Sequence, residues 1–108
     1  MGFKIGGSMD KKQIAMDFAK SLNHENIVKI ILFGSVAQGD DKKDSDIDII
    51  IITTDEDRIE DEVYTNVMDF LITTKEYISA KIIPIEDFNS FKDFPFFVNV
   101  NKEGVIIG

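Results

Sequence analysis

The sequence contains no cysteine and only one histidine in 108 residues. Without cysteine, the chain can form neither a disulfide bond nor a zinc site with thiolate ligands. The single histidine, His24, excludes a metal site built from several imidazole groups. It lies in the polar stretch 23–26, which we interpret as a surface turn. Sites that depend on cysteine or on several histidines are therefore excluded.

Basic residues and long apolar runs are also scarce. Twelve Lys and Arg residues against twenty Asp and Glu residues give a formal net charge of −8. Proteins that bind nucleic acids broadly usually present a basic face, so such binding is not expected. No run approaches the ~20 apolar residues of a membrane-spanning helix, and residues 1–8 do not resemble a signal peptide. We expect a cytoplasmic protein that does not associate with membranes.

The composition that remains is that of a globular domain. Hydrophobic residues make up 44% of the chain and charged residues 30%, which is ordinary for such a domain. A chain of this length builds one domain with a single modest core. Residues 1–9 contain three glycines and are predicted to form a loose N-terminal arm. We therefore expect one domain over residues 10–108.

Two short apolar segments, 27–33 and 46–54, are rich in β-branched residues and are predicted to be buried strands. The second begins with Asp46 and Asp48, which are two residues apart. Alternate residues of a strand point to the same face of a sheet, so the two carboxylates are expected side by side. Like charges this close repel each other, and a divalent cation is the usual way to stabilise them. The pair is a candidate metal site.

A glycine–serine turn lies between these two strands. Gly34 and Ser35 directly follow the first strand and lead into a short predicted helix. Backbone N–H groups, a hydroxyl and the positive end of a helix dipole together suit a phosphate. A phosphate site beside a metal-binding acid pair indicates that the chain binds a nucleotide. The intervening acidic residues Asp40, Asp41 and Asp44 are interpreted as a solvated loop.

The remaining pattern predicts helices over 10–22, 55–71 and 94–104, a short helical piece near 85–88, and strands over 78–82 and 105–107. The strand 78–82 alternates, with polar residues at Ser79 and Lys81. We therefore predict an α+β or α/β fold, in which helices pack on a small mixed sheet of three or four strands.

One pattern in the chain consists of Gly34-Ser35, ten further residues and then Asp46-x-Asp48. This pattern resembles the signature of the polymerase-beta-type nucleotidyltransferase superfamily. The size resembles the minimal nucleotidyltransferases, which often pair with a HEPN-domain protein. The resemblance covers about residues 10–108 and extends to the tail from Phe94 to Ile106. It implies a nucleotidyltransferase-like fold and an enzyme that transfers a nucleoside monophosphate from a nucleoside triphosphate such as ATP to a hydroxyl group.

The resemblance also implies roles for particular residues. Asp46 and Asp48 are expected to hold Mg²⁺ (or Mn²⁺) and to be catalytic. Gly34 and Ser35 are expected to bind the β- and γ-phosphates. Ser45 is a further nucleotide-site residue that mainly shapes the loop, and Lys81 is a candidate phosphate contact.

Two departures from the family pattern bear on activity. Family members usually carry a basic residue where this chain has Gln38. They also carry a third carboxylate on the strand after the long helix, where this chain has Ser79 and Lys81. Glu86 or Asp87 just past that strand, or a partner chain, are alternative sources of the third acid.

Three functions stay open at this stage. The first is an active transferase that modifies a protein or small molecule, for example as the antitoxin partner of a HEPN-type toxin. The second is a catalytically weak nucleotide-binding regulatory subunit, and the third is an interaction module. Five phenylalanines gather near the C-terminus: Phe88, Phe91, Phe94, Phe96 and Phe97. Most of them are expected to pack on the sheet, whereas an exposed subset would indicate a partner or self-association.

Overall fold

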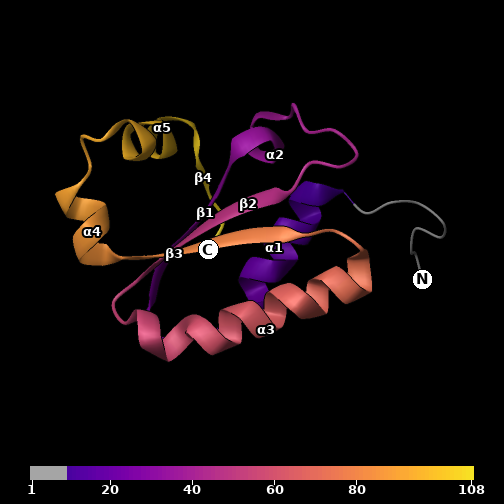
Figure 1. Ribbon diagram of the computed structural model, residues 1–108, viewed down its shortest axis with the longest axis horizontal. Helices are drawn as coiled ribbons and strands as arrows, with labels where there is room; N and C mark the ends of the chain where they lie inside the picture. The colour runs from indigo at the N-terminus through magenta and orange to yellow at the C-terminus, as the bar shows by residue number, and fades with distance from the viewer. Residues whose placement is uncertain (1–9) are drawn as a thin grey trace.

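The computed structural model describes residues 10–108, and the arm predicted over 1–9 lies outside the described residues. One four-stranded sheet with the strand order β3-β2-β1-β4 organises the described chain (Figure 1). The elements are α1 (Lys11–Ser21), β1 (Ile27–Phe33), α2 (Gly34–Gln38), β2 (Ile47–Thr53), α3 (Glu56–Thr74), β3 (Ile78–Pro84), α4 (Ile85–Ser90), α5 (Pro95–Glu103) and β4 (Val105–Ile106).

The sheet is mixed, as the sequence predicts. β1 pairs antiparallel with both β2 and β4, whereas β2 pairs parallel with β3. The helix α3 makes the crossover that a parallel pair requires. β2 lies at the centre of the sheet, and its residues from Ile49 to Thr53 are fully buried. A strand buried on both faces needs an almost continuous apolar sequence, which explains the isoleucine run of this segment. The α+β prediction is confirmed.

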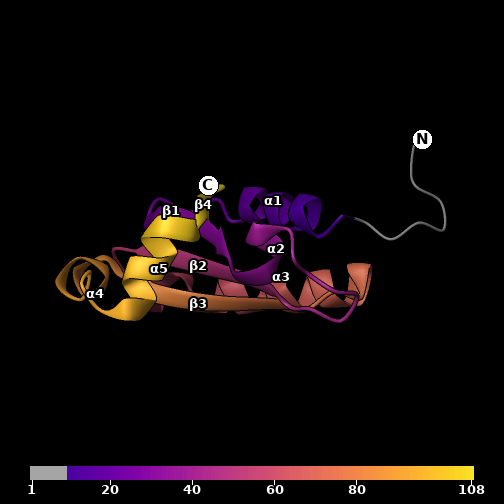
Figure 2. The same ribbon diagram turned by 90° about the horizontal axis from the view of Figure 1, so that it is seen from above.

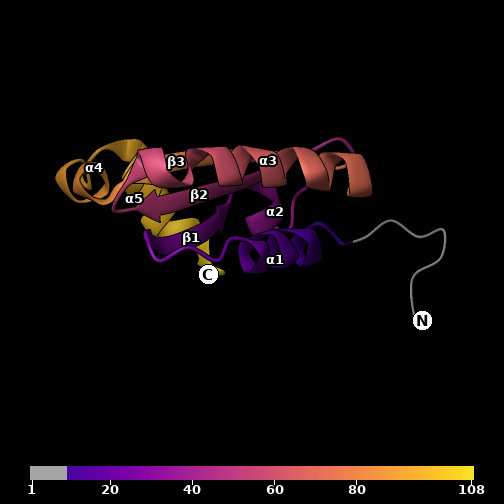
Figure 3. The same cartoon turned by 90° about the horizontal axis from the view of Figure 1, so that it is seen from below.

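The two faces of the sheet carry different cores. Ile47, Ile49 and Ile51 pack with residues of α1 and α3 on one face, and Figure 3 shows these two helices along the sheet. Ile50 and Ile52 pack on the other face with residues of α4 and α5. Seen from above, α5 lies on the near side of the strands and α3 on the far side (Figure 2). Alternation therefore directs Asp48 to the face that bears α4 and α5.

The boundary of β2 differs by one residue from the prediction. The strand begins at Ile47, so Asp46 directly precedes it and ends the loop after α2. Asp46 is exposed, whereas Asp48 is half-buried within the strand. The two carboxylates are therefore not equivalent, because only Asp48 is held by the pairing of the sheet. Within residues 10–108, no helix is long and apolar enough to cross a membrane.

Candidate functional site

The contact between Gly34 and Asp48 lies at the centre of the candidate site. Asp48 pairs with Phe33 across the antiparallel strands, which brings it beside Gly34 at the start of α2. Gly34 has a φ of +75°, and a β-carbon at this position would lie 2.5 Å from Asp48 Oδ2. A side chain is therefore excluded both by the backbone conformation and by the carboxylate. The glycine lets the Asp48 side chain lie directly against the turn.

Burial and charge perturb the Asp48 carboxylate. Desolvation raises its pKa, the charge of Lys81 lowers it, and the charge of Asp46 raises it, with a net rise above the ordinary value. The effect of Asp46 is that of a like charge close by. The two acids that the sequence singled out therefore lie close enough to repel each other.

The neighbouring strand β3 adds two polar side chains to the same face. Ser79 pairs with Asp48 and Lys81 pairs with Ile50 in the parallel register. The Lys81 ammonium lies 5.9 Å from the centre of the Phe33 ring. Ser79 is thus the nearest β3 position to Asp48, and Lys81 lies two residues further along the strand. The face predicted for the third acid carries these two residues.

Glu86 and Asp87 do not reach the acid pair, which corrects the alternative considered above. Both belong to α4, which follows the opposite end of β3 from Ser79. A strand rises about 3.3 Å per residue, so Ser79 and Pro84 alone are separated by about 17 Å. Among residues 10–108, no three His, Cys, Asp or Glu side chains form a group that could hold a metal ion.

A lysine that the sequence analysis missed fixes the loop before Asp46. The Lys11 ammonium donates to the backbone carbonyls of Lys42 (2.9 Å), Lys43 (3.0 Å) and Ser45 (2.6 Å). It also lies 3.5 Å from Glu76 Oε1. The lysine is only 8% exposed. Its position in a Lys-Lys pair at a helix start gives no sequence signal for burial, because such residues are usually solvated.

Three further polar residues come from α2 and from the loop that follows it: Ser35, Gln38 and Ser45. Ser35 is half-buried in α2, and its carbonyl accepts a hydrogen bond from the Asp40 N–H (2.9 Å). The Ser45 hydroxyl accepts one from the Lys42 N–H (2.8 Å), so it shapes the loop. The Gln38 amide donates to the Glu103 carbonyl (3.3 Å) and so joins α2 to α5.

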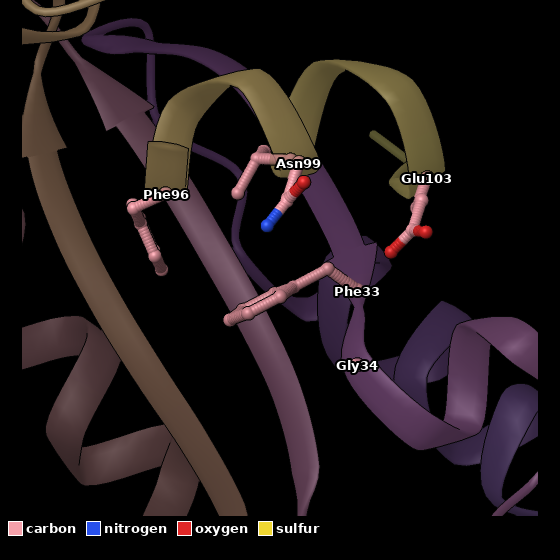
Figure 4. Close-up of a pocket in the computed structure, with 6 residues that line it drawn as sticks. Phe33, Gly34, Phe96, Asn99 and Glu103 are labelled. Atoms are coloured by element: carbon pink, nitrogen blue, oxygen red, sulfur yellow. The ribbon is translucent and has the colours of Figure 1, made fainter. Parts of the chain in front are cut away.

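A pocket of about 210 Å³ adjoins Gly34. It lies between the end of β1 and α5, and its lining residues are Phe33, Gly34, Phe96, Asn99, Val100 and Glu103. Figure 4 shows Asn99 and Glu103 extending from α5 toward Phe33. No sequence pattern marked this pocket, because it forms only when α5 folds over β1.

Comparisons with known proteins identify the family of the chain. Residues 17–107 match the family described as "Polymerase beta, Nucleotidyltransferase". A protein of Methanocaldococcus jannaschii named "Putative protein adenylyltransferase" is 33% identical over 102 residues, covering 92% of this chain and 99% of that protein.

Two solved structures have the same fold. A chain from a toxin–antitoxin structure with AMP-PNP has a TM-score of 0.56 and 16% identity over 93% of this chain and 73% of that chain. A chain from a mutant of the toxin–antitoxin MntA-HpeT has a TM-score of 0.55 and 14% identity, with the same coverage. The similarity of fold alone does not show family membership, but the family match and the 33% identity to the Methanocaldococcus jannaschii protein do. The chain therefore belongs to the polymerase beta nucleotidyltransferase family.

Proposed function

We propose that the protein transfers a nucleoside monophosphate from a magnesium–nucleoside triphosphate complex to a hydroxyl group of a protein. The observation that carries this proposal is the Asp46–Asp48 pair beside Gly34. Asp48 is desolvated and faces a like charge, and it packs against a turn that admits no side chain. An arrangement that raises the energy of a carboxylate is typical of a functional site.

The donor set suits Mg²⁺. This ion is usually held by one or two carboxylates together with waters and the phosphates of a substrate, rather than by a complete cage of side chains. Asp46 and Asp48 would supply the two carboxylates. When bound, the metal ion neutralises charge on the triphosphate and on the departing pyrophosphate. Mn²⁺, which also prefers oxygen ligands, fits the same pair.

The residues of this chain orient the substrate. Gly34 and Ser35 would hold the β- and γ-phosphates through backbone N–H groups and the Ser35 hydroxyl, with Lys81 as a further phosphate contact. The acceptor oxygen attacks the α-phosphorus, the bond to the β-phosphate oxygen breaks, and pyrophosphate leaves. The residue beside Asp48 is Ser79, which is a poor base, so the hydroxyl proton passes to water or to a carboxylate of the acceptor.

The names of the relatives support a choice of acceptor and partner. The archaeal relative is named as a protein adenylyltransferase, which favours ATP as donor and a protein hydroxyl over a small molecule as acceptor. The solved structures of similar fold come from toxin–antitoxin systems. We therefore propose that the protein is an antitoxin that modifies a HEPN-type toxin. Phe91 and Phe94, which are 42% and 58% exposed, are the proposed contact surface.

The metal-site part of the proposal is tested with Asp46→Asn/Asp48→Asn. The double variant should lose magnesium-dependent ATP binding in calorimetry, while its melting temperature without metal is unchanged or raised, because a like-charge pair is gone. Asp40→Asn/Asp41→Asn removes the same charge from an exposed loop and should bind Mg-ATP as the wild type does. Equal affinity in the wild type and in Asp46→Asn/Asp48→Asn would contradict the proposal.

The acceptor is tested by radiolabel transfer from ATP to the products of the neighbouring genes, among which we expect a HEPN-type toxin. Labelled toxin supports the proposal, and replacement of Phe91 and Phe94 by serine should reduce labelling without weakening Mg-ATP binding. Labelling of neither the toxin nor any other protein, with normal Mg-ATP binding, would favour a second function. In that case the protein is a nucleotide-binding regulatory subunit with little turnover, a function that the serine beside Asp48 favours.

A further inference from the structure

The pocket between α5 and the end of β1 adjoins the candidate site. Gly34 belongs to both, since it contacts Asp48 and also lines the pocket. A nucleotide whose phosphates lie at Gly34 would therefore extend its nucleoside part either into this pocket or into solvent. The pocket has a volume of about 210 Å³, and the residues that line it indicate whether it suits a nucleoside.

One face of α5 forms a wall of the pocket. Phe96, Asn99, Val100 and Glu103 are spaced by three, four and seven residues from the first, which aligns them on one side of a helix. Val100 is buried against the sheet, while Asn99 and Glu103 extend toward Phe33 (Figure 4). The hydrogen bond from Gln38 to the Glu103 carbonyl fixes this end of α5 to α2. The pocket is therefore preformed.

Aromatic rings supply its apolar surface. Phe33 and Phe96 meet edge to face, with ring centres 5.9 Å apart and an angle of 87° between their planes. Phe96 is 39% exposed, so part of its ring is free to contact a ligand. Any of the nucleobases can stack on an exposed aromatic ring, because each has a π-face. The rings therefore suit a flat heterocycle.

The polar groups of the pocket do not suit a phosphate. None of the six lining residues is basic, and Glu103 carries a negative charge. A carboxylate accepts hydrogen bonds only, which matches the hydroxyl groups of a ribose. The Asn99 amide both donates and accepts, and an asparagine amide makes a paired set of hydrogen bonds with the edge of adenine. A neutral nucleoside fits where a triphosphate does not.

We propose that this pocket binds the nucleoside part of the substrate, with the base against Phe33 and Phe96, Asn99 reading the edge of adenine, and Glu103 accepting from the ribose. This inference rests on the proposed function for the phosphate side of the site. It adds a binding subsite with named residues and a structural reason for a preference for adenine. The nucleotide then spans Gly34, with its charged end at the acid pair and its uncharged end under α5.

The experiment compares Mg-ATP with Mg-tripolyphosphate, which has the phosphates but no nucleoside. The wild type should bind Mg-ATP about tenfold more tightly, the lower part of the range for one stacked base. It should also bind ATP about tenfold more tightly than CTP. Equal affinity for ATP and tripolyphosphate would overturn the subsite but leave the phosphate site standing. A protein that binds none of these ligands would contradict both proposals.

Variants on α5 identify the residues. Phe96→Ala and Asn99→Leu should each weaken Mg-ATP binding by about tenfold and leave tripolyphosphate binding unchanged, which also shows that the variants fold. Asn99→Leu should abolish the preference for ATP over CTP. The matched controls Val98→Ala and Asn101→Leu alter residues of α5 that do not line the pocket and should bind ATP normally. Normal ATP binding by Phe96→Ala and Asn99→Leu, or an equal loss in the controls, would overturn the assignment.

Discussion

The Lys11 ammonium lies 2.6 Å from the backbone carbonyl oxygen of Ser45, the residue directly before Asp46. Two further carbonyls, of Lys42 and Lys43, accept from the same ammonium group. One side chain of α1 therefore fixes the backbone of the loop that leads to the acid pair. A cation in this position also offsets part of the negative charge of the loop.

The first prediction concerns this lysine. Lys11→Met keeps the approximate length of the side chain but removes the ammonium donor from three partly buried carbonyls, of which that of Lys42 still accepts from the Ser45 N–H. The free energy of unfolding should therefore fall by about 2–3 kcal/mol. Because the loop that carries Asp46 is released, Mg-ATP affinity should also fall. Thermal melting and calorimetry measure the two effects. Lys12→Met, at an exposed neighbouring position, should change neither, and a Lys11→Met protein of normal stability would refute the role.

The second prediction compares two glycines with the same backbone conformation. Gly34 and Gly39 have φ values of +75° and +79°, so alanine at either position costs about 1–2 kcal/mol from the left-handed conformation alone. No atom lies within 4 Å of a β-carbon at Gly39, whereas one at Gly34 meets Asp48. Gly34→Ala should therefore lose more stability than Gly39→Ala and should also lose Mg-ATP binding. Equal losses in both variants would show that the Asp48 contact is unimportant.

The third prediction concerns pH. The pKa of Asp48 is raised in the folded protein, chiefly by desolvation, so the native state binds this proton more tightly than the unfolded chain does. The free energy of unfolding then decreases as the pH rises from the ordinary aspartate pKa of about 4 through the higher pKa of folded Asp48. Asp48→Asn should melt a few degrees higher than the metal-free wild type at pH 7, and this difference should vanish as the pH falls below about 4. Asp44→Asn in the exposed loop should show no such gain.

The fourth prediction concerns the residue next to Asp48. Ser79→Asp places a carboxylate in register with Asp48, so nucleotidyl transfer with Mg²⁺ or Mn²⁺ should increase by about tenfold or more, within the range for a positioned base. Lys81→Asp, two residues further along β3, should give a smaller gain in turnover and a weaker affinity for Mg-ATP, because it also removes the proposed phosphate contact. Lys29→Asp is the control, because Lys29 lies over Phe88 near α4, at a distance from the acid pair. Brisk transfer by the wild type, with no gain in Ser79→Asp, would show that two acids suffice.

Most of the fold could be predicted because its strands are short and apolar. The runs 27–33 and 46–54 coincide with β1 and β2 to within one residue, since a central strand must be apolar on both faces. The alternation of β3 predicted that Ser79 and Lys81 share a face. The pairing partner of each strand residue could not be predicted, because periodicity assigns a face to each residue but does not fix the register between strands.

The parts of the site that escaped prediction depend on contacts between distant segments. Lys11 is buried by the loop 42–45, more than thirty residues away in the sequence, and nothing in its immediate neighbours indicates this. The pocket requires α5 to pack on β1. Glu86 and Asp87 are close in sequence to the third-acid position, but they follow the far end of β3 and therefore lie at the other end of the sheet.

The contact between Gly34 and Asp48 joins residues only fourteen positions apart, within the antiparallel pair β1–β2. The α5 wall of the pocket, in contrast, meets β1 from more than sixty positions away. Closing a short chain segment costs less entropy than closing a long one. The turn and the acid pair are therefore assembled by a short loop of the chain, whereas the pocket is completed only when the C-terminal segment returns to β1. A substitution that weakens the packing of α5 on β1 should therefore disturb the pocket before it disturbs the acid pair.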